Sequence, residues 1–229
     1  TSYASRLLVP MDQTQTNHLK AYGVAYWVLS KDVTIDWMLN FRGGSFLLPA
    51  TTGVENELII RGVSYELISD ATVAQFESQI ASPASNMDMM KLEKVPKIAV
   101  YSPKTKMPWD DAVTLALTYS EIPYTLVYDD ELMSDELTKY DWLHLHHEDF
   151  TGQYGKFYAS FSPYSWYQRQ QKDYEASARK HGFEKVSQLK LAISQKIRTF
   201  VAGGGFLFAM CSATDSFDIA LAANGVDFI

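Results

Sequence analysis

The stretch Gly203-Gly-Gly-Phe-Leu-Phe-Ala-Met-Cys-Ser212 decides the fold class of this chain. The glycines precede an apolar run that ends at Met210, which is typical of a central strand. The helical pattern Thr214 to Ala223 comes next, so the only cysteine, Cys211, lies where a strand turns into a helix. This is the layout of a nucleophile elbow, a sharp turn on which an α/β enzyme presents a reactive side chain.

Short apolar strands alternate with amphipathic helices along the rest of the chain. Strands are expected at residues 6–10, 33–39, 64–68, 97–102, 125–128, 141–146 and 205–210. Helices are expected at residues 16–30, 55–61, from 70 onward, and at 109–120, 187–201 and 214–223. The alternation predicts an α/β fold with a mostly parallel sheet and helices on both of its faces.

A linker-like segment over residues 81–97 divides the chain. Ala81-Ser-Pro-Ala-Ser-Asn86 is rich in turn-forming residues, and a polar, methionine-rich segment follows it. We therefore expect an N-terminal α/β half over residues 1–90 and a second α/β domain over residues 91–229.

Composition and charge limit the classes of function. Lysine and arginine (20) are outnumbered by aspartate and glutamate (27), and the net charge is −7, which argues against a nucleic-acid partner. No apolar run approaches the roughly 20 residues of a membrane-spanning helix, so the chain is not expected to span a membrane.

Ser2-Tyr3-Ala4 has the small-x-small form of a signal-peptidase site. It predicts export to the periplasm or cell envelope, with a cytoplasmic location as the alternative.

Polar residues that follow the strands are the candidates for chemistry, because ligands bind at the carboxyl ends of strands in open parallel sheets. Cys211 is the candidate nucleophile, and the start of the following helix favours its thiolate. His146 or His147 is the candidate base, and Glu148 or Asp149 would orient it. The alternative is a buried cysteine with a packing role only.

Two further clusters are weighed beside the cysteine. His144 and His146 are two residues apart on a strand and share one face with Glu148, so they could hold a metal ion, although hydrogen-bonded structural histidines explain the spacing better. The loop Arg42-Gly43-Gly44 could bind an anion through backbone amides, and Ser212 could do the same at the elbow; for the paired glycines a simple turn is the alternative. No cofactor is expected.

An aromatic insertion spans residues 150–186. Its members are Tyr154, Phe157, Tyr158, Phe161, Tyr164, Trp166 and Tyr167. Such a segment beside a strand end forms either a lid or substrate-facing wall, or a helical hairpin packed on its own domain.

Residues 95–229 resemble the class I glutamine amidotransferase-like superfamily, which has a flavodoxin-like sheet. The resemblance rests on Gly203 to Ser212 and on Tyr140-Asp-Trp-Leu-His-Leu-His-His147. It implies that Cys211 attacks an amide or a related carbonyl. The superfamily places its histidine and acidic partners on a later strand, whereas residues 212–229 alone follow Cys211. We therefore expect the domain to be truncated at its C-terminus.

Over nearly its whole length the chain also resembles a family of often exported Bacteroidota proteins that are commonly labelled asparagine synthetase B. The residues that carry this resemblance are Leu8-Val-Pro-Met-Asp12, Asn17 to Gly23, Arg42-Gly-Gly-Ser-Phe46 and His146 to Gly155. The label implies an N-terminal cysteine and a pyrophosphatase loop of the form Ser-Gly-Gly-x-Asp-Ser. Here the matching loop is Cys211-Ser-Ala-Thr-Asp-Ser216, which lacks both glycines, so nucleotide binding is not expected.

Three functions remain open from the sequence. The first is an amidotransferase-like or thiol-dependent hydrolase of the cell envelope that uses Cys211. The second is a non-catalytic envelope module that binds a small molecule or a protein. The third is a metal-dependent hydrolase that uses the cluster from His144 to Asp149.

Overall fold

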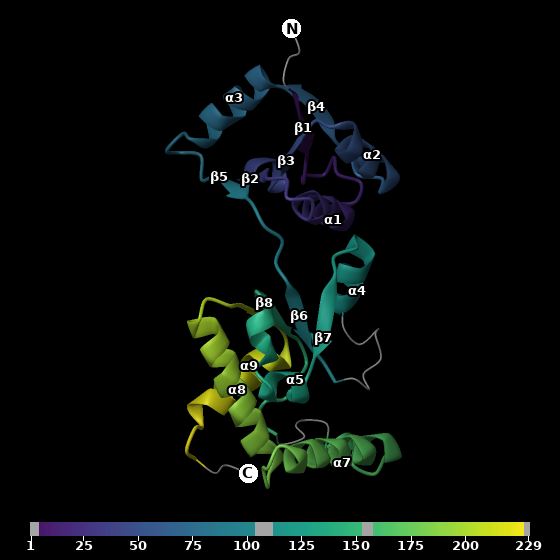
Figure 1. The fold of residues 1–229 in the computed structure, drawn as a ribbon, viewed down its shortest axis with the longest axis vertical. Coiled ribbons are helices and arrows are strands. Elements are labelled where there is room, and N and C mark those ends of the chain that lie inside the picture. The colour runs from purple at the N-terminus through teal and green to yellow at the C-terminus, as the bar shows by residue number, and fades with distance from the viewer. Residues whose placement is uncertain (1–4, 104–111, 153–157, 227–229) are drawn as a thin grey trace. The chain divides into compact units, whose positions relative to one another are not determined.

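The computed structural model describes residues 5–103, 112–152 and 158–226 and has α/β character. It contains two compact units (Figure 1). The first unit combines residues 1–95 with residues 112–123, and the second combines residues 96–111 with residues 124–229. The division between Val95 and Pro96 lies within the linker-like segment of residues 81–97. The return of residues 112–123 to the first unit was not anticipated from the sequence.

The first unit is built on one five-stranded sheet in the order β4-β1-β3-β2-β5. Its strands are β1 (Ser5–Val9), β2 (Ile35–Leu39), β3 (Phe46–Pro49), β4 (Glu66–Ser69) and β5 (Asp88–Leu92). Its helices are α1 (His18–Leu29), α2 (Thr52–Ile60), α3 (Asp70–Ile80) and α4 (Ala112–Ser120), with a short 3-10 turn η1 (Phe41–Gly43).

All neighbouring strands of this sheet are antiparallel, so the prediction of a mostly parallel sheet is wrong for the first unit. Two strands of this sheet, β3 and β5, are not predicted by the sequence, and β5 lies in the linker-like segment. Because a tight turn joins β2 to β3, these strands pair antiparallel, as a short connection requires.

The two faces of this sheet are covered by different helices. Leu7 and Val9 belong to a buried cluster with residues of α1 and α2, whereas Leu8 belongs to a cluster with Ile80 of α3. Successive residues of a strand point to opposite faces, so β1 is buried on both sides. Helices on both faces are thus found here on an antiparallel sheet.

Helix α4 packs against α1 within the first unit. Asn17, whose side chain also caps α1, donates through Nδ2 to the hydroxyl of Tyr119 over 2.7 Å, and Nζ of Lys20 lies 2.6 Å from a carboxylate oxygen of Glu121. At the centre of the contact, a Cβ atom added to Gly23 would lie 1.9 Å from the carbonyl oxygen of Ser120. The missing side chain of Gly23 therefore permits this close approach.

The second unit contains a four-stranded parallel sheet in the order β7-β6-β8-β9. Its strands are β6 (Ile98–Tyr101), β7 (Tyr124–Val127), β8 (Trp142–Leu145) and β9 (Phe206–Ala209). Its helical elements are α5 (Asp129–Met133), η3 (Glu136–Lys139), α6 (Tyr158–Phe161), α7 (Ser165–Lys180), α8 (Val186–Ala202) and α9 (Ser212–Ala222).

The core of the second unit lies on one face of its sheet. Leu143 and Leu145 of β8 share a buried cluster with Leu189, Ile193 and Ile197, which recur along one side of α8. The register places His144, Phe206 and Phe208 on the opposite face, where the two phenylalanines are exposed. Among the described helices of the protein, none is both long and apolar enough to cross a membrane.

Candidate functional site

Cys211 occupies a strained turn between β9 and α9. Its backbone has φ 53° and ψ −137°, and its side chain is exposed. Residues with a Cβ rarely adopt this conformation, which costs of order 1–3 kcal/mol and persists where the surrounding structure enforces it. The backbone amide of Met210 still donates to the carbonyl oxygen of Leu145 over 2.9 Å. The chain therefore turns sharply after the last backbone hydrogen bond between β9 and β8, and it presents the thiol at the carboxyl edge of the sheet.

Three hydrogen bonds hold this elbow against the loop that follows β8. The hydroxyl of Ser212 donates to the carbonyl oxygen of His147 over 3.0 Å. The amide of Ala213 donates to the carbonyl oxygen of His146 over 3.3 Å, and the hydroxyl of Ser216 donates to that of Glu148 over 2.9 Å. The structure thus places the cysteine segment beside the predicted histidine and acid segment.

The candidate base and its neighbours differ in exposure. His147 is exposed, whereas His146 and Glu148 are buried. The rings of His146 and His147 are 3.6 Å apart between centroids, and the Glu148 carboxylate accepts the backbone amide of His146 over 3.1 Å. Asp149 accepts from the backbone amide of Thr151 over 2.9 Å and so shapes the following loop. His147 is therefore the histidine whose exposure matches that of Cys211.

His144 lies deeper than the other two histidines. It is fully buried, and its ring stacks on Phe208 with centroids 5.8 Å apart. Over the described part of the chain, no three His, Cys, Asp or Glu side chains are arranged to hold one metal ion. The alternative metal set of His144, His146 and Glu148 is therefore not assembled as a ligand cage.

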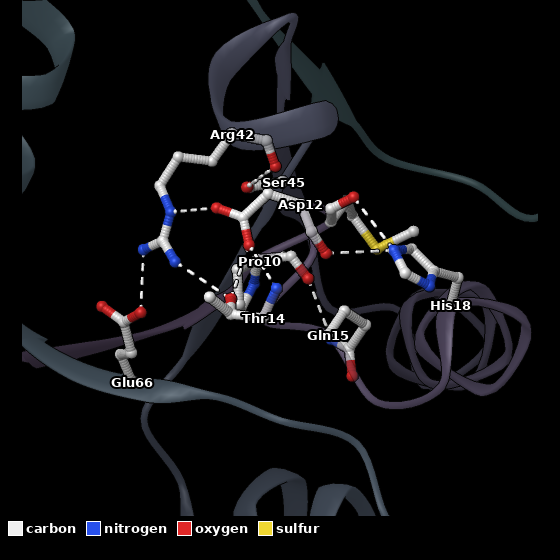
Figure 2. Close-up of polar contacts among 9 residues, drawn as sticks. Pro10, Asp12, Thr14, Gln15, His18, Arg42, Ser45 and Glu66 are labelled. Atoms are coloured by element: carbon white, nitrogen blue, oxygen red, sulfur yellow. Dashed lines mark hydrogen bonds and ion pairs between the residues drawn. The ribbon is translucent and has the colours of Figure 1, made fainter.

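Arg42 belongs to a polar network of the first unit (Figure 2). Its Nε donates to Asp12 and its Nη1 to Glu66, both over 2.8 Å, while Nη2 donates to Thr14 over 3.2 Å. These bonds raise the pKa of Arg42, and the bonds from Arg42 and then Thr14 hold the pKa of Asp12 well below its usual range. All three guanidinium nitrogens are engaged with this chain's own side chains.

The paired glycines shape the same loop. Gly43 and Gly44 have φ values of 82° and 95°, and a Cβ atom on Gly43 would lie 2.3 Å from the carbonyl oxygen of Met11. The glycines therefore let the loop press against the segment after β1, which favours the turn interpretation. Arg42, Gly43 and Gly44 lie in the first unit and Ser212 in the second, so the structure does not gather them within one unit.

A buried polar cluster of the second unit was not identified from the sequence. Nζ of Lys190 lies 2.7 Å from Oδ1 of Asp129 and 2.8 Å from the hydroxyl of Tyr101. Burial, and then the charge of Asp129, raise the pKa of Tyr101 far above its ordinary value. The available signals were a lysine at an apolar position of α8 and an acidic residue directly after β7.

The aromatic insertion contains α6 and α7, with Tyr154 and Phe157 outside the described residues. Tyr158, Tyr164 and Trp166 are exposed, whereas Tyr167 is buried. Ala178 of α7 joins the core cluster, so the far end of this helix packs on its own unit. The exposed aromatic residues Tyr164 and Trp166 lie at the start of the helix.

Comparison of the chain with protein-family models, with curated proteins and with solved structures found no match.

Proposed function

We propose that this protein is a thiol-dependent acyl-transfer enzyme of the amidotransferase-like or hydrolase type, with Cys211 as its nucleophile. The observation that carries the proposal is the backbone of Cys211, at φ 53° and ψ −137°, between the edge strand β9 and an eleven-residue helix. An enforced, strained turn with an exposed thiol is the geometry of a nucleophile elbow. A cysteine that only packs has no need of this conformation.

The reaction would begin with attack of the Cys211 thiolate on the carbonyl carbon of an amide or ester. A C–S bond forms, and the carbonyl electrons move to the oxygen, which becomes an oxyanion. In such elbows the amide of the residue after the nucleophile donates to that oxyanion, and here this residue is Ser212. The C–N or C–O bond then breaks, and the leaving group takes a proton. Water attacks the thioester, which releases the acid and restores the thiol.

His147 would supply the proton transfer. As general base it takes the thiol proton and then returns it to the leaving group. It is exposed like Cys211, and its carbonyl oxygen accepts the Ser212 hydroxyl, which ties it to the elbow. Glu148 holds the backbone of His146 and would fix the loop that carries the base.

The proposal includes a flavodoxin-like assignment for the second unit. Numbered along the chain within this unit, its strands have the order 2-1-3-4. This agrees with the first four strands of the flavodoxin order 2-1-3-4-5. Placement of the protein in the periplasm or cell envelope remains part of the same proposal and rests on the Ser2-Tyr3-Ala4 motif and on the resemblance to an exported family.

The test compares alkylation rates of the single thiol. Iodoacetamide is applied to the folded protein and to the urea-unfolded chain between pH 5 and 9, and labelling of Cys211 is followed by mass spectrometry. The folded thiol is expected to react faster than the unfolded one, because an exposed nucleophile beside a general base is activated by it. His147→Ala is expected to lower the rate of the folded thiol towards that of the unfolded chain.

A folded thiol that reacts no faster than the unfolded one at every pH would overturn the proposal. The matched control is His181→Ala. His181 lies at the C-terminal end of α7 and binds Asp130, which is not part of the elbow loop. It is expected to leave the alkylation profile unchanged. If both histidine variants shift the profile equally, the assignment of His147 is wrong.

A further inference from the structure

A cavity lies at the carboxyl edge of β6 and β7, within the second unit. It measures about 300 Å³, and its lining comes from the residues after these two strands and from α7. Pro103 and Tyr128 line it from the strand ends, and Gln170, Asp173 and Tyr174 line it from α7. Open parallel sheets bind ligands at this edge. None of the residues proposed for catalysis is among those that line it.

The floor of the cavity is a charged side chain that is almost wholly buried. Asp129 lines the cavity and is 1% exposed, and its Oδ2 accepts the hydroxyl of Ser177 over 3.0 Å. Its other oxygen accepts from Nζ of Lys190. Burying such a pair is costly and is weak as a device for stability alone. The pair with Lys190 and the bond from Ser177 fix the position of the Asp129 carboxylate in the lining.

Tyrosine rings surround the same point. Nζ of Lys190 lies 4.5 Å from the ring centroid of Tyr128 and 5.7 Å from that of Tyr174. The faces of these rings attract cations. This wall of the cavity therefore already holds one ammonium group, between tyrosine rings and a carboxylate.

The charged side chains of the lining are all acidic, and two of them are paired with cations of this chain: Asp129 with Lys190, and Asp130 with Lys180. The described members of the lining include four carboxylates, from Asp129, Asp130, Glu131 and Asp173, and neither lysine nor arginine. Lys180 and His181 reach the cavity rim only through Asp130, over 2.6 and 2.8 Å. Burial, and after it the charge of Asp129, raise the pKa of Tyr128 well above its ordinary value.

We propose that this cavity binds a small organic cation that carries a primary ammonium group. The carboxylates would accept its N–H donors, with Asp173 as the outer contact, and the rings of Tyr128 and Tyr174 would cover its charge or its methylene groups. Gln170 Nε2, which donates to the Tyr174 hydroxyl over 2.7 Å, would hold that ring in place. The site is separate from the proposed thiol chemistry, so it does not depend on Cys211.

Calorimetric titration of the whole chain with 1,4-diaminobutane at low salt tests the proposal. The neutral isostere 1,4-butanediol and the sugar glucose are titrated in parallel. Binding of the diamine is expected, with weaker binding as salt rises, because the contacts are ionic. Butanediol and glucose are expected not to bind. Cys211→Ala is expected to bind the diamine as the unchanged protein does, which separates this test from that of the thiol.

Two variants of α7 locate the binding. Asp173→Asn is expected to weaken diamine binding about two- to fivefold, the effect of one exposed ion pair. Glu175→Gln removes the same charge from the opposite face of α7 and is expected to leave the affinity unchanged. The proposal is overturned if the diamine does not bind at about 20 mM. Equal binding of butanediol, preferential binding of glucose, or equal effects of the two variants would also overturn it.

Discussion

The hydroxyl of Ser216 donates to the carbonyl oxygen of Glu148 over 2.9 Å, in a buried hydrogen bond that joins α9 to the loop after β8. Ser216→Ala removes the donor and leaves a buried carbonyl without this bond, at an expected cost of about 1 kcal/mol in unfolding free energy. Urea unfolding measures the loss. The exposed Ser160→Ala serves as control and is expected to change stability by less than about 0.5 kcal/mol. Equal midpoints for the two variants would show that this bond contributes nothing measurable.

The strained backbone of Cys211 predicts an unusual order of stability among its variants. Cys211→Gly removes the Cβ that disfavours φ 53°, whereas Cys211→Ala keeps it. We expect the glycine variant to be more stable than the alanine variant by about 1 kcal/mol, although glycine is normally the destabilising choice. Thermal unfolding of both purified variants checks the order. An alanine variant that is the more stable of the two would contradict the observed turn.

The contact between α1 and α4 makes Gly23 intolerant of a side chain. Gly23→Ala would drive a Cβ into the carbonyl of Ser120, so we expect a loss of about 1–3 kcal/mol, as for overpacking. Gly53→Ala in α2 is the matched control, because a Cβ there has nothing within 4 Å. It is expected to stabilise by up to about 1 kcal/mol. Chemical denaturation of the two variants should therefore shift in opposite directions.

The network around Asp12 predicts a dependence of stability on pH. Its pKa is lowered in the folded state, mainly by the hydrogen bond from Arg42, so the ionised carboxylate stabilises the fold at pH values above the unfolded pKa of about 4. This contribution is lost as the pH falls from there towards the folded pKa. The difference between the unchanged protein and Asp12→Asn should therefore be present at pH 7 and shrink on acidification. Asp32→Asn, outside the network, should show no such convergence.

The buried pair of Lys190 and Asp129 predicts strong coupling between two substitutions. Lys190→Met leaves the Asp129 carboxylate buried without its cation, at an expected cost of about 3–5 kcal/mol. Asp129→Asn in the same chain removes the carboxylate charge that has lost its partner. The double variant should therefore lose less unfolding free energy than the sum of the two single losses. Equilibrium unfolding of all four proteins gives the coupling. Additive losses would mean that the two groups stabilise the fold independently.

The sequence predicts the second unit better than the first. The glycine-led apolar run before Cys211 and the helical period after it are strong local signals, and a strand and a helix are present there. The prediction that this strand is central is wrong, because β9 lies at the edge of the four-stranded sheet and its two phenylalanines are exposed. Strands β3 and β5 are missed because Phe46-Leu-Leu-Pro49 is short and ends in proline, while Asp88 to Leu92 mixes polar residues with methionine. The antiparallel direction of the first sheet depends on which strands pair with each other. The hydrophobic periodicity of a single segment carries no information on its partner or its direction.

The candidate site is predictable only in part. Segments 144–149 and 211–216 were expected to meet because both follow strands of one sheet, and the hydrogen bonds from α9 bring them together. The engagement of Arg42 by Asp12 and Glu66 was not foreseen, since it depends on a left-handed backbone at Arg42 itself, with φ 44°. Lys190 was not identified because it lies among the apolar residues of α8, and one lysine changes the helical period of those residues little.

The placement of α4 has a consequence for how the chain matures during synthesis. Residues 112–123 are made after strand β6 of the second unit, so the first unit lacks this helix while residues 96–111 are being synthesised. During this interval the surface of α1 around Gly23 is not covered by α4. A nascent chain stalled with residue 95 just outside the exit tunnel should be cleaved by proteases at α1 more readily than one stalled with residue 123 outside it.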